Sequence, residues 1–323
     1  MTGAGYLHRL DPALAGLVRA EDDLRHPCPP GGQMRDSLFW QVSIAEERIC
    51  LQTYFFATDD GNAGANICLW GEGIEPAVVD FHSGSIPDDC DFSVISLGGL
   101  SVRQDIAAQR STLSYAGARL SFDFSFSALH EAFSYHANAD GLPAWMAANR
   151  IEQSGILQGW IEIDGRRLSL DGRIGHRDHS WGLREWAMPQ HWKWLAAYTP
   201  DGSITMNGWI WIAGGERGVA GYVARDGKVS PITAIRDHAE YDAEMMQQSA
   251  RMSIDHGAAQ PLELELDTFS AIRFPSSRRN PVTITEAGCA ATLDGIAGSG
   301  QFETHWPTPY LDYLRQRKQA GQG

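Results

Sequence analysis

The amino-acid sequence predicts an all-β protein in which short antiparallel strands build two barrels or sandwiches in tandem. Two segments alternate strictly between apolar and polar residues, SFDFSFS at 121–127 and LELELDTF at 262–269. This period of two is typical of half-buried strands in an antiparallel sheet. Asp-Gly pairs, which suit tight hairpin turns, separate strand-like segments at Asp164-Gly165, Asp201-Gly202, Asp226-Gly227 and Asp294-Gly295. Many short strands joined by hairpins are typical of barrels and sandwiches.

The chain length supports two domains. A barrel of this kind holds about 150 residues, and the chain has 323. We expect the boundary between residues 150 and 165, near the first clear Asp-Gly hairpin. This assigns an N-terminal β-barrel domain to residues 1–160 and a C-terminal β-barrel domain to residues 161–323.

Helical signals are few. We expect a helix at 11–26, a short helix at 141–152 and a short terminal helix from residue 308 onward. The segment 233–252 is polar enough for a surface helix, although it fits the beginning of a strand equally well.

Composition and charge narrow the class of partner. Hydrophobic residues make up 43% of the chain and charged residues 20%, which is enough apolar material for a packed core. The formal net charge is −14, so the chain would be repelled by nucleic acid and by an anionic membrane surface. We therefore expect no nucleic-acid partner.

The cysteines and the N-terminus indicate a soluble, cytoplasmic protein. The cysteine count is odd and no CxxC pair occurs, which favours free, buried thiols over a disulfide framework or a zinc ribbon. These cysteines are Cys28, Cys50, Cys68, Cys90 and Cys289. The first residues lack the apolar segment of a signal peptide, and no apolar run reaches the roughly 18 residues of a membrane span.

Tryptophan is concentrated in one region. Six of the eleven tryptophans fall within residues 181–211: Trp181, Trp186, Trp192, Trp194, Trp209 and Trp211. On extended strands Trp192 and Trp194 share one face, as do Trp209 and Trp211. Such a cluster forms either a tryptophan-rich core or the wall of a pocket for a hydrophobic ligand. Both interpretations stay open, and Trp181, Trp192, Trp194, Trp209 and Trp211 are candidate substrate-binding residues.

The segment GHRDHSWGLREW at 175–186 carries the most concentrated chemistry. As a strand, it would direct its side chains to two faces. One face would carry His176, Asp178 and Ser180, and the other Arg177, His179 and Trp181. One face would enter a barrel and the other would contact the neighbouring domain. Because a buried charge must be paired, the segment is either a polar latch between domains or an acid/base site.

The acid/base interpretation assigns roles to particular residues. Asp178 or His179 would transfer the proton, and His176 and Arg177 complete the candidate catalytic set. Arg177 or Arg184 would tune the proton-transfer group or hold a substrate oxygen. We expect no metal, because His176 and His179 face opposite sides of a strand. His191 is a third candidate ligand, but the sequence contains no HExxH motif that would complete a site.

The same segment resembles the carotenoid 1,2-hydratase (hydroxyneurosporene synthase) and AttH-like superfamily. The resemblance rests on Asp178-His179-Ser180-Trp181-Gly182 after the strand pair RIEQSGILQGWIEIDGRRLSLDG, and it covers roughly residues 150–215. The RDHSWG form is closest to an uncharacterised bacterial branch of that group. The resemblance implies two tandem lipocalin-like (calycin) barrels. It also implies chemistry without a cofactor on a hydrophobic substrate, by a hydratase or a cyclase.

Two functions follow from these expectations. The first is a cofactor-independent lyase, hydratase, isomerase or cyclase that acts on a hydrophobic small molecule in a tryptophan-lined pocket near the domain seam. The second is a non-catalytic carrier of lipocalin type, which needs the same pocket and no acid. In either case the partner is a small hydrophobic molecule, and the protein is a monomer or a homodimer.

Overall fold

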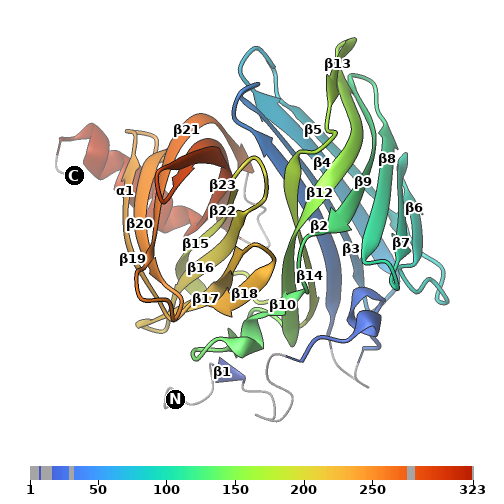
Figure 1. Cartoon of the computed structure of the whole chain (residues 1–323), viewed down its shortest axis with the longest axis horizontal. Helices are drawn as coiled ribbons and strands as arrows, with labels where there is room; N and C mark the ends of the chain where they lie inside the picture. Colours follow the sequence, from blue (N-terminus) through green and yellow to red (C-terminus); the bar gives the residue numbers. More distant parts are fainter. Residues whose placement is uncertain (1–6, 9–16, 29–32, 275–280, 322–323) are drawn as a thin grey trace.

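The computed structural model describes residues 7–8, 17–28, 33–274 and 281–321. Its strands form two large antiparallel sheets and one two-stranded sheet. Figure 1 shows the two large sheets side by side. The tandem all-β, lipocalin-like fold predicted from the sequence is therefore confirmed. Within the described residues, no helix has both the length and the apolar character needed to cross a membrane.

The first sheet curves into a nearly closed barrel (Figure 1). Its strands run in the order β5-β4-β3-β2-β14-β12-β9-β8-β7-β6, with β10 and β13 also paired to β12. The bounds are β2 Arg35–Ile44, β3 Ile49–Thr58, β4 Asn62–Gly71, β5 Val78–Ser85, β6 Val94–Leu97, β7 Leu100–Asp105, β8 Arg110–Ala116, β9 Leu120–Ala128, β10 Phe133–Ser134, β12 Asn149–Ile163, β13 Arg166–Ser169 and β14 Ile174–Gly182.

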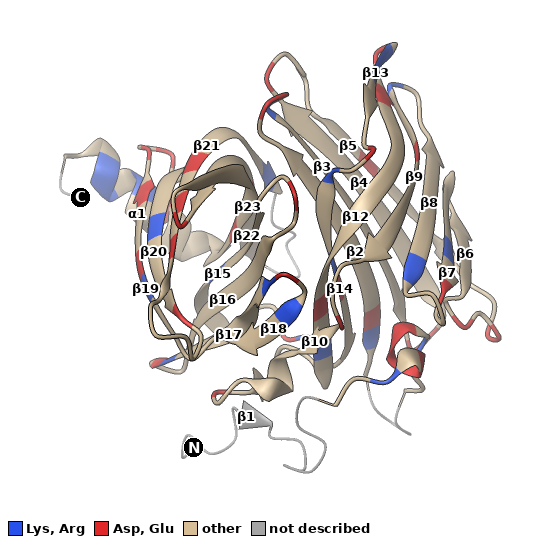
Figure 2. Ribbon diagram, in the orientation of Figure 1, with Lys and Arg blue, Asp and Glu red and all other residues tan. Residues whose placement is uncertain are grey.

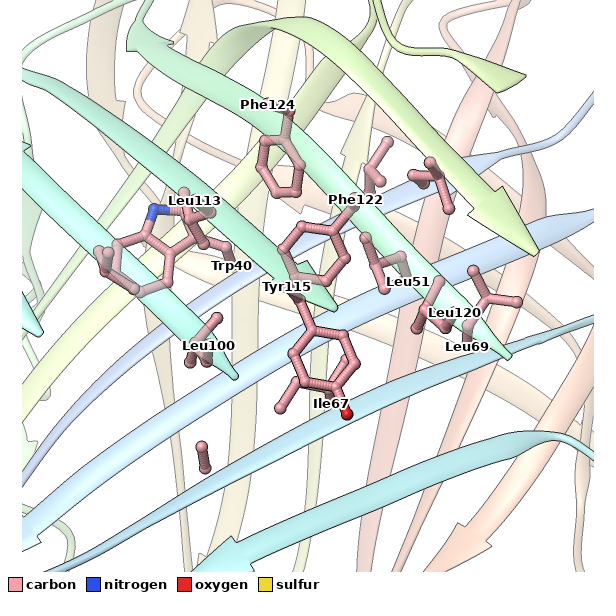
Figure 3. Close-up of a cluster of buried hydrophobic side chains, with 14 of the residues drawn as sticks. Trp40, Leu51, Ile67, Leu69, Leu100, Leu113, Tyr115, Leu120, Phe122 and Phe124 are labelled. Atoms are coloured by element: carbon pink, nitrogen blue, oxygen red, sulfur yellow. The ribbon is translucent and has the colours of Figure 1, made fainter. Parts of the chain in front are cut away.

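A large aliphatic and aromatic core fills the interior of this barrel. Figure 3 shows part of it, with side chains from distant strands meeting in one layer. Phe122 and Phe124 of β9 belong to this core, while Asp123 between them is exposed. The alternation predicted for 121–127 is thus a half-buried strand.

The second sheet forms a half-barrel with its own core (Figure 1). The strand order is β18-β17-β16-β15-β23-β22-β21-β20-β19. The bounds are β15 Pro189–Tyr198, β16 Ile204–Ala213, β17 Glu216–Arg225, β18 Lys228–Pro231, β19 Ala234–Tyr241, β20 Gln247–Asp255, β21 Leu262–Phe274, β22 Val282–Leu293 and β23 Ile296–Pro307, after which helix α1 spans Thr308–Gln319. Acidic residues recur along the outer strands β19 to β21 in Figure 2.

A third apolar cluster lies between the two sheets, and it is strongly aromatic. The period of two explains it. On β2, Leu38 belongs to the first barrel's core and Phe39 to the middle cluster. On β15, Leu195 belongs to the second core and Trp194 to the middle cluster. Where the two sheets face each other, each therefore buries both of its faces, one in its own core and the other against its neighbour.

Short elements complete the chain. The 3₁₀ helix η3 spans Tyr135–Ala137, and the two-stranded sheet joins β1 Leu7–His8 to β11 Leu142–Pro143. A further 3₁₀ helix, η2, spans Ala20–Asp23.

Local predictions had mixed outcomes. The Asp-Gly turns are confirmed at Asp164, Asp226 and Asp294, where both residues have positive φ. The terminal helix is confirmed as α1. The helix predicted at 141–152 is wrong, because β11 and the start of β12 occupy it, and 233–252 forms β19 and most of β20. Of 11–26, residues 11–16 lie outside the described residues, and the rest contains only η2 as helix.

The predicted domain boundary falls inside a strand. Residues 160 and 161 are both in β12, which pairs with β14 of the first sheet. The motif strand β14 is inserted between β2 and β12, so it completes the first barrel and does not begin the second. Because the chain changes sheets between Gly182 and Pro189, we propose the domain boundary at 183–188.

Cys50, Cys68, Cys90 and Cys289 are free thiols. Cys50, Cys68 and Cys289 are buried, while Cys28 and Cys90 are partly exposed. The prediction of free, buried thiols is confirmed for Cys50, Cys68 and Cys289.

Strand β12 requires a glycine at position 159. It has φ of +132°, and a Cβ atom there would lie 2.2 Å from the carbonyl oxygen of Asp123. We expect Gly159→Ala to lower the free energy of unfolding by at least about 1–3 kcal/mol. The cost of a positive φ for alanine and the cost of the clash with the backbone both contribute to this loss. Gly165→Ala is the control, since its φ is +83° but the space around it is open. Urea unfolding checks this, and equal losses for the two variants would contradict it.

Candidate active site

A cavity of about 190 Å³ lies between the two sheets. Both sheets contribute to its wall, which combines aromatic side chains with converging polar and charged groups. The lining residues used below are Asp178, Arg150, Arg184, Glu286, Glu303 and the indoles of Trp192, Trp194 and Trp209. An apolar, largely buried site with a few placed polar groups is the usual form of a small-molecule pocket.

One of the two faces of strand β14 lines this cavity. Asp178 and Ser180 line the cavity, and His176 lies on the same face behind it, 5.6 Å from Trp194 between ring centroids. His179 lies on the opposite face, beside Phe92 of the first barrel's core. The two-faced strand expected from the sequence is therefore present, with its even positions toward the second sheet.

A network of hydrogen-bonded, mostly charged side chains holds Asp178. Arg150 donates from Nη2 to Asp178 Oδ2 at 2.8 Å and from Nε to Glu152 Oε1 at 2.5 Å. Glu152 also receives His176 Nε2 at 2.7 Å and Trp194 Nε1 at 3.2 Å. All these groups are buried, so the network holds Asp178 in one position.

The network separates the two carboxyl groups in proton affinity. Burial raises the pKa of Asp178 to about 7, against the opposing effect of Arg150. For Glu152, burial also acts to raise the pKa, but the charge of Arg150 and the hydrogen bond from His176 outweigh it and leave the pKa lowered. Asp178 can therefore exchange a proton near neutral pH while Glu152 stays ionised.

His176 is a support for Glu152 and not an exposed base. It is fully buried, and burial lowers its pKa. Its Nε2 faces the carboxylate of Glu152, and its Nδ1 lies 3.3 Å from Ser154 Oγ. A neutral imidazole with its proton on Nε2 satisfies both contacts.

Arg184 places a second cation at the cavity. It donates from Nε to the Met146 carbonyl oxygen and from Nη2 to Ser180 Oγ, both at 2.7 Å. Burial lowers its pKa to about 10, which still leaves it charged at neutral pH. Its position fits the predicted role of holding a substrate oxygen.

The second sheet contributes two acids that sequence reasoning missed. Glu286 of β22 and Glu303 of β23 stand directly opposite each other and both line the cavity. A signal for them existed: a two-residue Asp294-Gly295 hairpin sets the register in which 286 pairs with 303.

The predicted tryptophans divide into two groups. Trp192, Trp194 and Trp209 line the cavity, and so does Trp186, which was not among the predicted site residues. Trp211 is buried beside Trp209 and does not reach the cavity wall.

Three predicted site residues lie on the other face of β14, away from the cavity: Arg177, His179 and Trp181. Arg177 pairs with Asp23 through two hydrogen bonds of 2.5 and 2.9 Å. His179 Nε2 meets Asp36 Oδ1 at 2.6 Å. Trp181 stacks on His26 with 3.6 Å between centroids. This face is a latch, but it ties the N-terminal segment to the first barrel and not one domain to the other.

The three histidines considered as metal ligands have separate surroundings. His176 and His179 face opposite ways, and His191 contacts the His305 carbonyl oxygen at 2.8 Å. His179 instead groups with His26 and Asp36, and one ligand atom from each lies within 4.8 Å of the others. Asp36 and His179 already form a direct hydrogen bond there.

The comparison with protein families identifies the chain's relatives. Residues 19–308 match the model of a domain of unknown function, DUF7064. The chain belongs to the DUF7064 family. No curated protein matches its sequence.

Solved structures share the fold of this DUF7064 chain at low identity. The AttH-like protein NE1406 from Nitrosomonas europaea superposes with a TM-score of 0.68 at 14% identity, covering 92% of this chain and 98% of that one. CghA with Sch210972 gives 0.62 at 13%, covering 85% and 88%. Kievitone hydratase from Nectria haematococca gives 0.60 at 10%, covering 95% and 98%. These confirm the AttH-like fold predicted from the motif.

The buried network around Glu152 should contribute to the stability of the DUF7064 chain. Glu152→Ala leaves Arg150 its bond to Asp178 but removes the buried acceptor of Arg150 Nε, His176 Nε2 and Trp194 Nε1. We therefore expect a loss of at least about 1–3 kcal/mol in the free energy of unfolding. Glu162→Ala is the matched control on the same strand, because Glu162 forms a surface pair with Arg167 worth about 0–1 kcal/mol. Chemical denaturation measures both, and similar losses would contradict the account.

Proposed function

We propose that this protein is a cofactor-independent enzyme that transfers protons to and from a hydrophobic small molecule, as a lyase (hydratase or dehydratase), isomerase or cyclase. The proposal rests on the position and the proton affinity of Asp178. It lies on the wall of an aromatic cavity, and burial brings its pKa to about 7. A carboxyl group with that proton affinity can accept and release a proton at neutral pH.

The relatives of this fold support the reaction class. One structure of the same fold is a hydratase, kievitone hydratase. Another, CghA, was solved with the small molecule Sch210972. The proposed substrate class is isoprenoid, steroid, polyketide or aromatic, because four indoles line the cavity beside its polar groups.

The proposed mechanism uses the groups that face the cavity. Asp178 acts as the base and removes a proton from a substrate carbon. Arg150 restrains the carboxylate in the direction of the cavity, and Arg184 binds a substrate oxygen. The π-faces of Trp192, Trp194 and Trp209 exclude water and stabilise positive charge that develops on the substrate. His179 has no proton-transfer role, because it faces the first barrel.

We expect turnover in a panel of isoprenoids, steroids, polyketides and aromatic compounds incubated in D₂O, with deuterium incorporation or a change of mass as the readout. Asp178→Asn should slow it by about 10²–10⁴-fold, the usual contribution of general acid/base catalysis. Asp123→Asn, an exposed aspartate on β9, is the control and should change nothing. A compound that binds but exchanges no hydrogen and returns unchanged would contradict the enzyme and indicate a carrier.

The pH dependence tests the role of Asp178 separately. If the carboxylate is the active form, activity rises as pH passes through about 7, where Asp178 loses its proton. The rise should disappear from the residual activity of Asp178→Asn. Measured pH–rate profiles check this, and a rise centred near the ordinary carboxyl pKa of about 4 would contradict it.

A further inference from the structure

We propose that Glu286 and Glu303 share one proton and form a second proton-transfer group, which donates to a neutral hydroxyl oxygen of the ligand from the wall opposite Asp178. The inference rests on the proposed function and deepens it, because it names the complementary acid and the substrate class. That class is apolar alcohols with a hydrogen on the neighbouring carbon, or the corresponding alkenes in the hydration direction.

The register brings the two carboxyl groups together. Glu286 of β22 and Glu303 of β23 are direct cross-strand partners, and side chains in such positions are about 4.5–5.5 Å apart at Cβ. Both side chains line the same cavity, so the two carboxyl groups lie in the same confined space. Two carboxyl groups in opposed positions repel each other when both are ionised, and one proton shared between them removes that repulsion.

The side chains that donate hydrogen bonds to the two carboxyl groups are neutral. Gln301 Nε2 donates to Glu286 Oε2 at 2.8 Å, and Trp192 Nε1 donates to Glu303 Oε1 at 2.5 Å. Both donors are uncharged. Among the residues that the structure describes, no lysine or arginine forms a salt bridge with either carboxyl. Two opposed, uncompensated negative charges in a buried site would be strongly destabilising.

Glu152 shows that burial alone does not decide whether a glutamate is protonated. Glu152 and Glu286 are both buried glutamates, but Glu152 is paired with Arg150 and His176. The pKa of Glu152 is accordingly lowered, whereas burial and the neighbouring Glu303 raise the pKa of Glu286 well above its ordinary value. The different partners of the two glutamates keep one ionised and the other protonated.

The two walls together complete a balanced reaction. In the dehydration direction the proton of the Glu286–Glu303 pair moves to the hydroxyl oxygen of the ligand. The C–O bond breaks and its electron pair leaves with the water molecule. Asp178 takes a proton from the neighbouring carbon, and the electrons of that C–H bond form the C=C bond. Hydration is the reverse, and exchange with solvent restores the starting protonation.

Infrared spectroscopy of the whole protein tests the shared proton without a substrate. At a pH of about 9, Asp178, with a pKa of about 7, and ordinary carboxyl groups are ionised. We expect a protonated-carboxyl C=O band that shifts in D₂O. It should persist in Asp178→Asn and in the control Glu265→Gln, an exposed glutamate of the same sheet. It should be lost in Glu286→Gln combined with Glu303→Gln.

The absence of that band from the wild-type protein would overturn the inference, and so would a band that survives the double substitution. Turnover separates this failure from that of the proposed function. We expect Glu286→Gln to lower kcat by about 10²–10⁴-fold. If Asp178→Asn abolishes turnover while Glu286→Gln leaves it unchanged, the pair is not the acid and the proposed function stands. If neither substitution affects turnover, the proposed function itself is wrong.

Discussion

Arg150 holds together two carboxyl groups that would otherwise repel each other at the centre of the molecule. The register of β12 and β14 places Glu152 directly opposite Asp178, and like charges in opposed positions destabilise a sheet. Arg150 lies two residues before Glu152 on the same face and donates to both. One arginine cannot fully compensate two buried carboxylates. Glu152 has His176 as a further partner, and the uncompensated cost therefore falls on Asp178.

This constraint connects the fold to the chemistry. β14 is inserted between β2 and β12, so the motif strand has the first barrel's core on one face and the second sheet on the other. The face toward the second sheet presents Asp178 to a cavity walled by indoles. A second pair of opposed acids, Glu286 and Glu303, lies on the other wall. The two sheets thus meet through surfaces on which carboxyl groups are held in apolar surroundings.

Local patterns in the sequence were sufficient for the strands, the hairpins and the two faces of the motif. They were insufficient for the domain boundary, because the pairing of β14 with β2 joins residues about 140 positions apart and leaves no local trace. Asp178 could be selected by residue type, but the choice between its face and that of His179 needed the position of the second sheet. Glu286 and Glu303 could have been paired from the Asp294-Gly295 turn. Their position at the cavity between the sheets depends on the packing of the two domains.

The central claim is that the fold makes Asp178 a group that titrates at neutral pH. A ¹³C NMR titration of protein labelled at the aspartate carboxyl carbons measures this directly, with the resonance assigned by its absence from Asp178→Asn. The account predicts a midpoint for Asp178 near pH 7. A midpoint near the ordinary aspartate value of about 3.9 would contradict it.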